Sequence, residues 1–235
     1  MIEGKNAVLS TFIRTWFVAR LVWYCNCADK NATIILYFGG VNMDENIKAV
    51  EDSYIINQID ATIKKIWTKE IKHDYKTGWL LKEDTLKNSF YFHLRKKLGK
   101  LFDENDIRIF TEFTDEKFKG TGRRPDMVIA KVDFDKEVSY WGDSVTECLA
   151  VIEFKYKSGF TASTDIYEDY KKMRWYANKL KAEGKLYMAT IWEYEDDETA
   201  WENENNKWAK GKLVELNASY IRGTKEMRFY VKSHW

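Results

Sequence analysis

The chain contains a single proline, Pro125, and it stands directly before Asp126. Proline has no backbone N–H to donate to a sheet, so it belongs at the start of a strand or on a sheet edge. The stretch 126–130 is apolar after its first residue. Pro125 therefore predicts a strand that begins at Asp126, and it helps to aim this aspartate by fixing how the chain enters the strand.

Hydrophobic periodicity along the rest of the chain predicts an α/β fold. Apolar residues at helical spacing predict helices at about 44–69, 81–101 and 165–180. Apolar or alternating runs predict strands at 107–113, 126–130, about 148–156, 186–192 and 228–231. The acidic stretch 193–206 is predicted to be a solvated loop or an exposed helix. The order of helix, three strands, helix and strand predicts a mixed central sheet flanked by helices.

The length of 235 residues favours one domain, and we assign residues 43–235 to it. Residues 1–42 form an extension with two open interpretations. Arg14 and Arg20 interrupt its apolar stretches, and an arginine near mid-bilayer costs about 2.5–3.5 kcal/mol, which disfavours a spanning helix. Either the segment packs as a short helix and strand against the main domain, or the natural chain starts at Met43. We favour the second, because Met43 opens an amphipathic helix.

Charge and cysteine content limit the partners and the compartment. The 38 basic and 37 acidic residues nearly cancel, which counts against avid non-specific DNA binding but not against an enzyme that touches a short stretch. The three cysteines form no CxxC pair, so a disulfide framework or a structural zinc site is disfavoured. A reducing cytoplasm is the expected compartment. Cys148 is expected to be a small buried apolar residue.

Two acidic residues and a lysine form the candidate site. Glu153 and Lys155 are two positions apart in an apolar run, so they share one face of the predicted strand. Asp126 meets them if its own strand is the neighbour. Two carboxylates with an adjacent ammonium group are the components of a metal-dependent phosphodiesterase site. The alternative is a simple ion pair of Glu153 and Lys155 at the rim of the sheet.

The pattern of Pro125 and Asp126 followed by Glu153, Phe154 and Lys155 resembles the PD-(D/E)XK nuclease superfamily, which has the restriction-endonuclease-like fold. The order of elements is similar to the core of that family, and the resemblance covers roughly residues 79–192. It implies an Mg²⁺-dependent nuclease that hydrolyses DNA phosphodiester bonds, with Mn²⁺ as an alternative ion. It also suggests a setting in restriction, defence or repair.

The resemblance also implies roles for individual residues. Asp126, Glu153 and Lys155 are the expected catalytic residues. The expected metal ligands are Asp126, Glu153 and the backbone carbonyl of Phe154, with Glu83 of the leading helix as a further contact. Lys155 is expected to orient the attacking water, to stabilise charge in the transition state or to transfer a proton, and the sequence does not choose among these roles.

Other charged residues near the site have two interpretations each. Arg123 and Arg124 adjoin Asp126 and are candidates for phosphate contacts, with a solvated turn as the alternative. Lys172, on the helix after the site, is a further candidate for a phosphate contact. Glu112 is by default an exposed strand residue, and a role in the site stays open. His93 is expected at the edge of the core.

Three questions about function stay open at this level. The chain is expected to be an enzyme, but a catalytically silent module of the same fold that binds nucleic acid or protein is the main alternative. RNA is an alternative substrate to DNA. No dimer interface is legible in the sequence, so the oligomeric state is open and a dimer is one possibility.

Overall fold

The computed structural model describes residues 19–25, 32–38, 43–114, 124–158, 164–180, 183–196, 201 and 206–235. The chain divides into two compact units, Met1–Asp52 and Ser53–Trp235. The first unit contains an antiparallel hairpin of β1 (Ala19–Cys25) and β2 (Ala32–Phe38). The short helix considered for this segment is therefore not found at these positions, where two strands pair. Within the described residues, no helix is long and apolar enough to cross a membrane.

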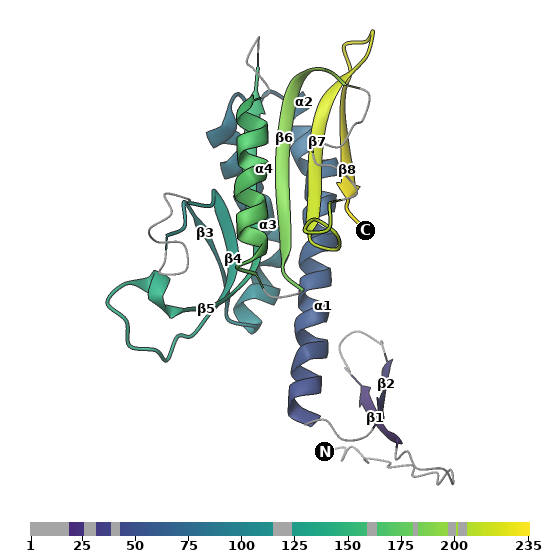
Figure 1. Cartoon of the computed structure of the whole chain (residues 1–235), viewed down its shortest axis with the longest axis vertical. Helices are drawn as coiled ribbons and strands as arrows, with labels where there is room; N and C mark the ends of the chain where they lie inside the picture. The colour runs from purple at the N-terminus through teal and green to yellow at the C-terminus, as the bar shows by residue number, and fades with distance from the viewer. Residues whose placement is uncertain are drawn as a thin grey trace. The chain divides into compact units, whose positions relative to one another are not determined.

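The second unit is built on a mixed sheet with the strand order β3-β4-β5-β6-β7-β8 (Figure 1). Its strands are β3 (Ile107–Thr111), β4 (Met127–Val132), β5 (Val145–Lys157), β6 (Lys185–Asp196), β7 (Leu213–Ile221) and β8 (Met227–Ser233). The pairs β5–β6 and β6–β7 are parallel, and the other neighbouring pairs are antiparallel. The parallel pair β5–β6 is joined through a helix, because parallel strands need a long crossover connection.

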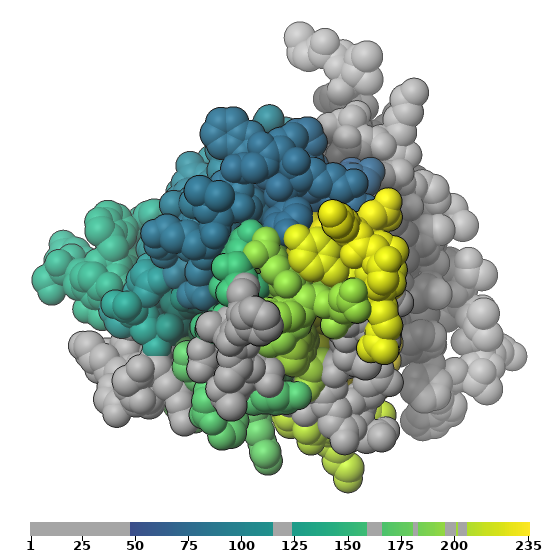
Figure 2. All heavy atoms as spheres, turned by 90° about the horizontal axis from the view of Figure 1, so that it is seen from above, coloured from purple at the N-terminus to yellow at the C-terminus, as the bar shows by residue number. Residues whose placement is uncertain are grey.

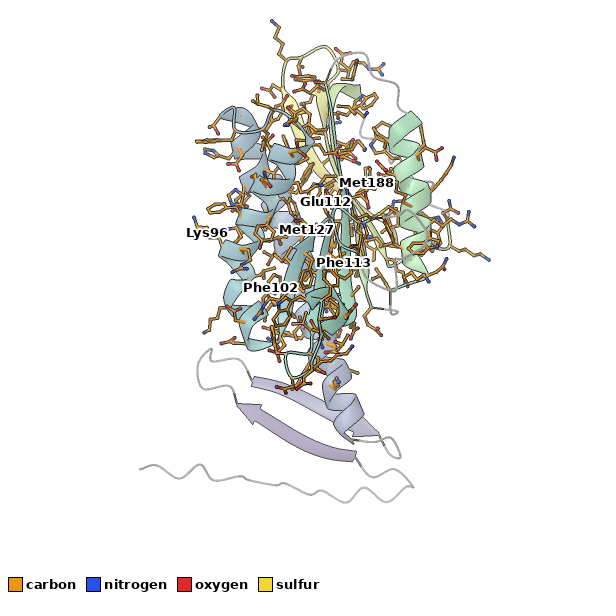
Figure 3. The ribbon with its side chains drawn as sticks, turned by 90° about the vertical axis from the view of Figure 1, so that its left-hand side faces the viewer. Lys96, Phe102, Glu112, Phe113, Met127 and Met188 are labelled. Atoms are coloured by element: carbon orange, nitrogen blue, oxygen red, sulfur yellow. The ribbon has the colours of Figure 1, made fainter. Side chains whose placement is uncertain are left out.

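Helices cover both faces of this sheet. They are α1 (Met43–Lys65), the π-helical turns η1 (Ile66–Ile71), α2 (Lys72–Lys76), α3 (Glu83–Glu104) and α4 (Thr164–Ala177). A short 3₁₀ turn, η2 (Trp141–Ser144), precedes β5. In the side view of Figure 3, α3 lies on one side of the strands and α4 on the other, and Figure 1 shows α4 in front of the sheet. The predicted class, a mixed central sheet flanked by helices, is confirmed.

The two faces of the sheet carry separate apolar cores. Ile152 and Phe154 of β5 belong to the core shared with η1 and α3, where Phe154 meets Phe90 edge to face at 5.2 Å between ring centroids. Val128 and Val151 belong to the other core, under α4. Alternate residues of a strand point to opposite faces, so this division confirms the predicted face for Val128 and Val151. The face under α4 is also the one on which Glu153 and Lys155 were predicted.

Most predicted elements are confirmed, with shifts at their ends. The predicted helices correspond to α1, α3 and α4, and the predicted strands to β3, β4, β5, β6 and β8. The prediction for 193–206 is wrong at its start, because β6 continues to Asp196. Glu193 is drawn into the sheet by hydrogen bonds from the hydroxyl groups of Tyr75 (2.8 Å) and Tyr156 (3.0 Å). Cys148 is buried, as predicted.

Strand β7 was not predicted, because it buries polar residues. Glu215 is fully buried and pairs with Nε2 of His234 at 2.9 Å, and its other oxygen accepts hydrogen bonds from Asn217 and the backbone of Trp201. Such residues interrupt the apolar pattern that identifies a central strand in a sequence. Hydrogen bonds to both oxygens of Glu215 make its burial tolerable.

Aromatic residues of η1 and α2 pack against the C-terminal strands β7 and β8. Phe229 of β8 lies 5.4 Å from Trp67 and 5.8 Å from Tyr75 between ring centroids. The indole N–H of Trp67 donates to the carbonyl of Asn217 in β7 (3.0 Å). Figure 2 shows the blue segment with η1 and α2 beside the yellow C-terminal strands. These contacts hold the segment that precedes α3 against the sheet.

The core under α3 gives a direct test of the fold. We expect Phe90→Ala to lower the free energy of unfolding by about 3–5 kcal/mol, because it removes a fully buried ring and leaves a cavity beside Phe154. Urea unfolding followed by circular dichroism measures this loss. Phe92→Ala, two residues along the same helix and 57% exposed, is the matched control and should cost below about 1 kcal/mol. Equal losses would contradict the assignment of the buried face of α3.

Candidate active site

Asp126 lies directly before β4 and is held at three points. Its backbone carbonyl accepts the N–H of Glu112 (3.0 Å), and the carbonyl of Pro125 accepts the N–H of Phe113 (3.1 Å). Its Oδ2 accepts the backbone N–H of Phe154 from β5 (2.8 Å), and its Oδ1 accepts Nζ of Lys87 (2.8 Å). Pro125 thus lies next to the start of β4, as predicted. The carboxylate of Asp126 is held against β5.

Glu153 is buried in β5, one pair beyond the Met127–Ile152 register position. Its Oε1 is buried and has no hydrogen-bond partner among the described residues. Burial raises the pKa of Glu153 well above its ordinary value, and the charges of Asp126 and Asp169 raise it further. The Lys172 ammonium and the Tyr176 hydroxyl lower this pKa without offsetting the rise. Two adjacent carboxylates in a dry site need a proton or a cation between them.

Lys155 is paired with an aspartate that was not predicted. Its Nζ lies 2.8 Å from Oδ2 of Asp169 in α4 and 3.6 Å from Oε2 of Glu83 at the start of α3. The other oxygen of Asp169 accepts Nζ of Lys172 (2.5 Å). Burial lowers the pKa of Lys155, but the hydrogen bond and charge of Asp169 outweigh it, so the net pKa is raised. Lys155 therefore keeps its proton.

Lys87 of α3 is the second unpredicted member of the site. Its side chain is 11% exposed, and its Nζ contacts both Oδ1 of Asp126 (2.8 Å) and Oε1 of Glu112. Burial lowers the pKa of Lys87, but hydrogen bonds to Asp126 and Glu112 outweigh it and raise the net value. Lys87 and Glu83 lie one helical turn apart on α3. The ammonium group of Lys87 therefore contacts Asp126, and the carboxylate of Glu83 lies near Lys155.

Glu112 adopts a rare backbone conformation next to the site. It follows β3 with φ of 51°, in the left-handed region, which costs a non-glycine residue of order 1–3 kcal/mol. Its Oε2 lies 2.8 Å from Nε of Arg124, so the carboxylate contacts two cations. Figure 3 places Glu112 near Met127, the residue after Asp126. Glu112 is exposed, as the default prediction has it, but it lies just past the end of β3 and its carboxylate contacts Lys87.

The structure gathers most of the predicted residues at one place. Asp126, Glu153, Lys155 and Glu83 interact through direct contacts or through their charges. Lys172 and Arg124 lie beside them but are paired with Asp169 and Glu112. Arg123 lies outside the described residues. His93 binds Asp74 Oδ2 (2.9 Å) rather than any of these groups.

Helical spacing was the available signal for the two missed residues. Lys87 stands four positions after Glu83, and Asp169 stands three positions before Lys172. Side chains at these spacings share one side of a helix. A charged residue that accompanies a predicted site residue in this way is therefore a candidate member of the same site.

The donor set suits a hard divalent cation held by few protein ligands. Among the residues that the structure describes, no group of three or more His, Cys, Asp or Glu side chains is arranged to hold a metal ion, and Glu83 is turned to Lys155. Mg²⁺ is commonly bound by one or two carboxylates, with water and phosphate oxygens completing its octahedron. The buried, unpartnered Oε1 of Glu153 beside Asp126 fits this kind of binding.

Comparison with known proteins gives no family assignment. No protein-family model matches the sequence, and no curated protein matches it. Among solved structures, the chain is similar to NucC of P. aeruginosa ATCC27853 in its cAAA-bound form, at 12% identity and a TM-score of 0.35. The alignment covers 83% of this chain and 85% of that chain. A TM-score of this size does not establish a common fold.

The raised pKa of Glu153 predicts how metal-free protein responds to pH. A glutamate in the unfolded chain ionises near pH 4.3. Above about that pH the native state, in which Glu153 keeps its proton, binds more protons than the unfolded state, so the stability of the wild-type protein falls as pH rises. Glutamine cannot ionise. We therefore expect the stability of Glu153→Gln relative to wild type to increase from about pH 5 to about pH 8, measured by urea unfolding in EDTA.

The control for this experiment is Glu226→Gln, at an exposed position before β8. Its stability relative to wild type should stay level over the same pH range. A level difference for Glu153→Gln as well would contradict the buried, proton-holding state of this carboxylate.

Proposed function

We propose that the chain is a metal-dependent nuclease of the PD-(D/E)XK type that hydrolyses DNA phosphodiester bonds. The observation that carries this proposal is the buried carboxylate oxygen of Glu153, without a described partner, beside Asp126 and two residues before Lys155. The α3–β3–β4–β5–α4–β6 order supports it, since the same order of elements suggested the resemblance. A setting in restriction, defence or repair is part of the proposal.

Asp126 and Glu153 are the proposed ligands of Mg²⁺ or Mn²⁺, with the carbonyl of Phe154 as a backbone ligand. Glu83 is a further ligand if it turns away from Lys155. A bound divalent ion supplies Lewis-acid polarisation of a phosphoryl oxygen and a lowered pKa for a bound water. The N–H of Phe154 orients the Asp126 carboxylate toward β5, and burial keeps competing water away from Glu153.

Lys155 is the proposed charge stabiliser. Its raised pKa keeps it as an ammonium group, so it is a poor general base and a good partner for negative charge that develops on the phosphate oxygens. Asp169 holds the ammonium in position. In the reaction a water molecule gives up one proton as its oxygen forms a new bond to phosphorus, the P–O ester bond breaks, and the departing oxygen takes up a proton.

Phosphate contacts by Arg123, Arg124 and Lys172 are part of the proposal. Arg124 is 58% exposed and Lys172 40% exposed at the side chain, so both offer N–H groups to a substrate while each keeps one internal ion pair. The near-balance of 38 basic and 37 acidic residues favours a short contact over an extended electrostatic groove.

A catalytically silent module is the second candidate. It is favoured by one observation: Asp126 and Lys155 already have internal partners in Lys87 and Asp169, which is how a purely structural ion-pair network looks. Such a protein would bind nucleic acid or protein without turnover.

Substitution of the proposed catalytic residues separates these candidates. We expect Asp126→Asn and Lys155→Ala each to lower the rate of Mg²⁺-dependent cleavage of plasmid and linear DNA by about a hundred-fold or more. Matched RNA and DNA strands, offered separately, decide the substrate. Gel assays with Mg²⁺, Mn²⁺ or EDTA measure the rates.

Matched controls exist on the same sheet. Asp133→Asn, just past the far end of β4, and Lys185→Ala, at the start of β6, should leave cleavage within a few-fold of wild type. DNA binding with no metal-dependent turnover in wild type would favour the silent module. Equal cleavage by wild type and Lys155→Ala would refute the proposed site.

A further inference from the structure

The contacts of Lys87 place an ammonium group between two carboxylates. Its Nζ lies between a carboxylate oxygen of Asp126 and one of Glu112, and contacts both. Neighbouring carboxylates are stabilised by a proton or a cation between them, and at a two-metal site the second divalent ion is such a cation. Here the cation is covalently attached to α3.

Asp126 offers its two oxygens in different directions. Oδ1 faces Lys87, and Oδ2 accepts the N–H of Phe154, the residue next to Glu153. A carboxylate that bridges two cations uses one oxygen for each. The Oδ2 side, toward Glu153, is the side of the proposed divalent ion, and the Oδ1 side is taken by Lys87.

The surroundings of Lys87 hold this arrangement in place. Glu112 is kept in the left-handed region by its N–H bond to the carbonyl of Asp126, so its carboxylate is aimed at Lys87 despite the backbone cost. Arg124 binds the second oxygen of Glu112. Backbone strain at a site is retained when the surrounding structure requires that position.

We propose that Lys87 is an internal cation that replaces a second divalent metal, so that this enzyme binds one metal ion per chain. The inference rests on the proposed function, because the first ion is the one expected at Asp126 and Glu153. Lys87 is a positioning residue: it supplies the second positive charge beside Asp126 and keeps Glu112 from serving as a metal ligand. The number of bound ions reports on this role independently of catalytic activity.

Metal stoichiometry tests the proposal. Titration of the full chain with Mn²⁺, followed by isothermal calorimetry and by electron paramagnetic resonance of free Mn²⁺, should give one ion per wild-type chain. Lys87→Met removes the ammonium while keeping an unbranched apolar stem, and should bind two ions. The double variant Lys87→Met/Glu112→Gln should return to one, because the second position then lacks a carboxylate.

Two single variants complete the set. Lys96→Met, an exposed lysine that points away from the sheet on the same helix (Figure 3), is the matched control and should bind one ion with wild-type affinity. Glu112→Gln should also bind one ion, with affinity within about three-fold of wild type, because Glu112 pairs with Lys87 and is not a ligand of the metal. This variant keeps the proposal testable if Lys87→Met does not fold.

The outcomes separate this inference from the proposed function. Two Mn²⁺ ions in wild type, one ion in folded Lys87→Met, or a ten-fold loss of affinity in Glu112→Gln would each overturn the role of Lys87 and leave the nuclease proposal standing. No Mn²⁺ binding by wild type would overturn the nuclease proposal and the inference with it.

Discussion

The antiparallel pairing of β4 with β5 is the constraint on which the candidate site depends. Met127 pairs with Ile152, so Asp126 and Glu153 lie opposite each other at the next position, directly before β4. Because a one-residue slip in register would turn every side chain to the opposite face, the two apolar cores fix this pairing strongly. Ile152 and Phe154 fill one core and Val151 the other, which leaves Glu153 on the face under α4.

Charge compensation across the layers follows from that pairing. Two carboxylates brought together in a buried place repel each other, and the helices supply the balancing charges. Lys87 reaches Asp126 from α3, and Lys172 of α4 lowers the pKa of Glu153 in part. Asp169 in turn holds Lys155. The network leaves one oxygen of Glu153 without a hydrogen-bond partner among the described residues.

Much of the fold was predictable because its elements follow simple periodicities. The stripe of Leu86, Phe90 and Leu94 is fully buried in α3, and the strands of apolar residues are found where they were predicted. Strand β7 was missed for a physical reason: the buried Glu215 takes its partners His234 and the backbone of Trp201 from outside the strand. Burial of polar residues depends on such partners, which a local pattern does not reveal.

The amino-acid sequence by itself determined the identity of Asp126, Glu153 and Lys155 as candidates and the strand faces to which they belong, because strand periodicity is a local property of the backbone. Only the tertiary structure decided their partners. Lys87 and Asp169 come from helices on opposite sides of the sheet, and the left-handed conformation of Glu112 depends on its contact with the Asp126 backbone. Electrostatic pairing acts through space, so it follows from how layers pack and not from the order of residues along the chain.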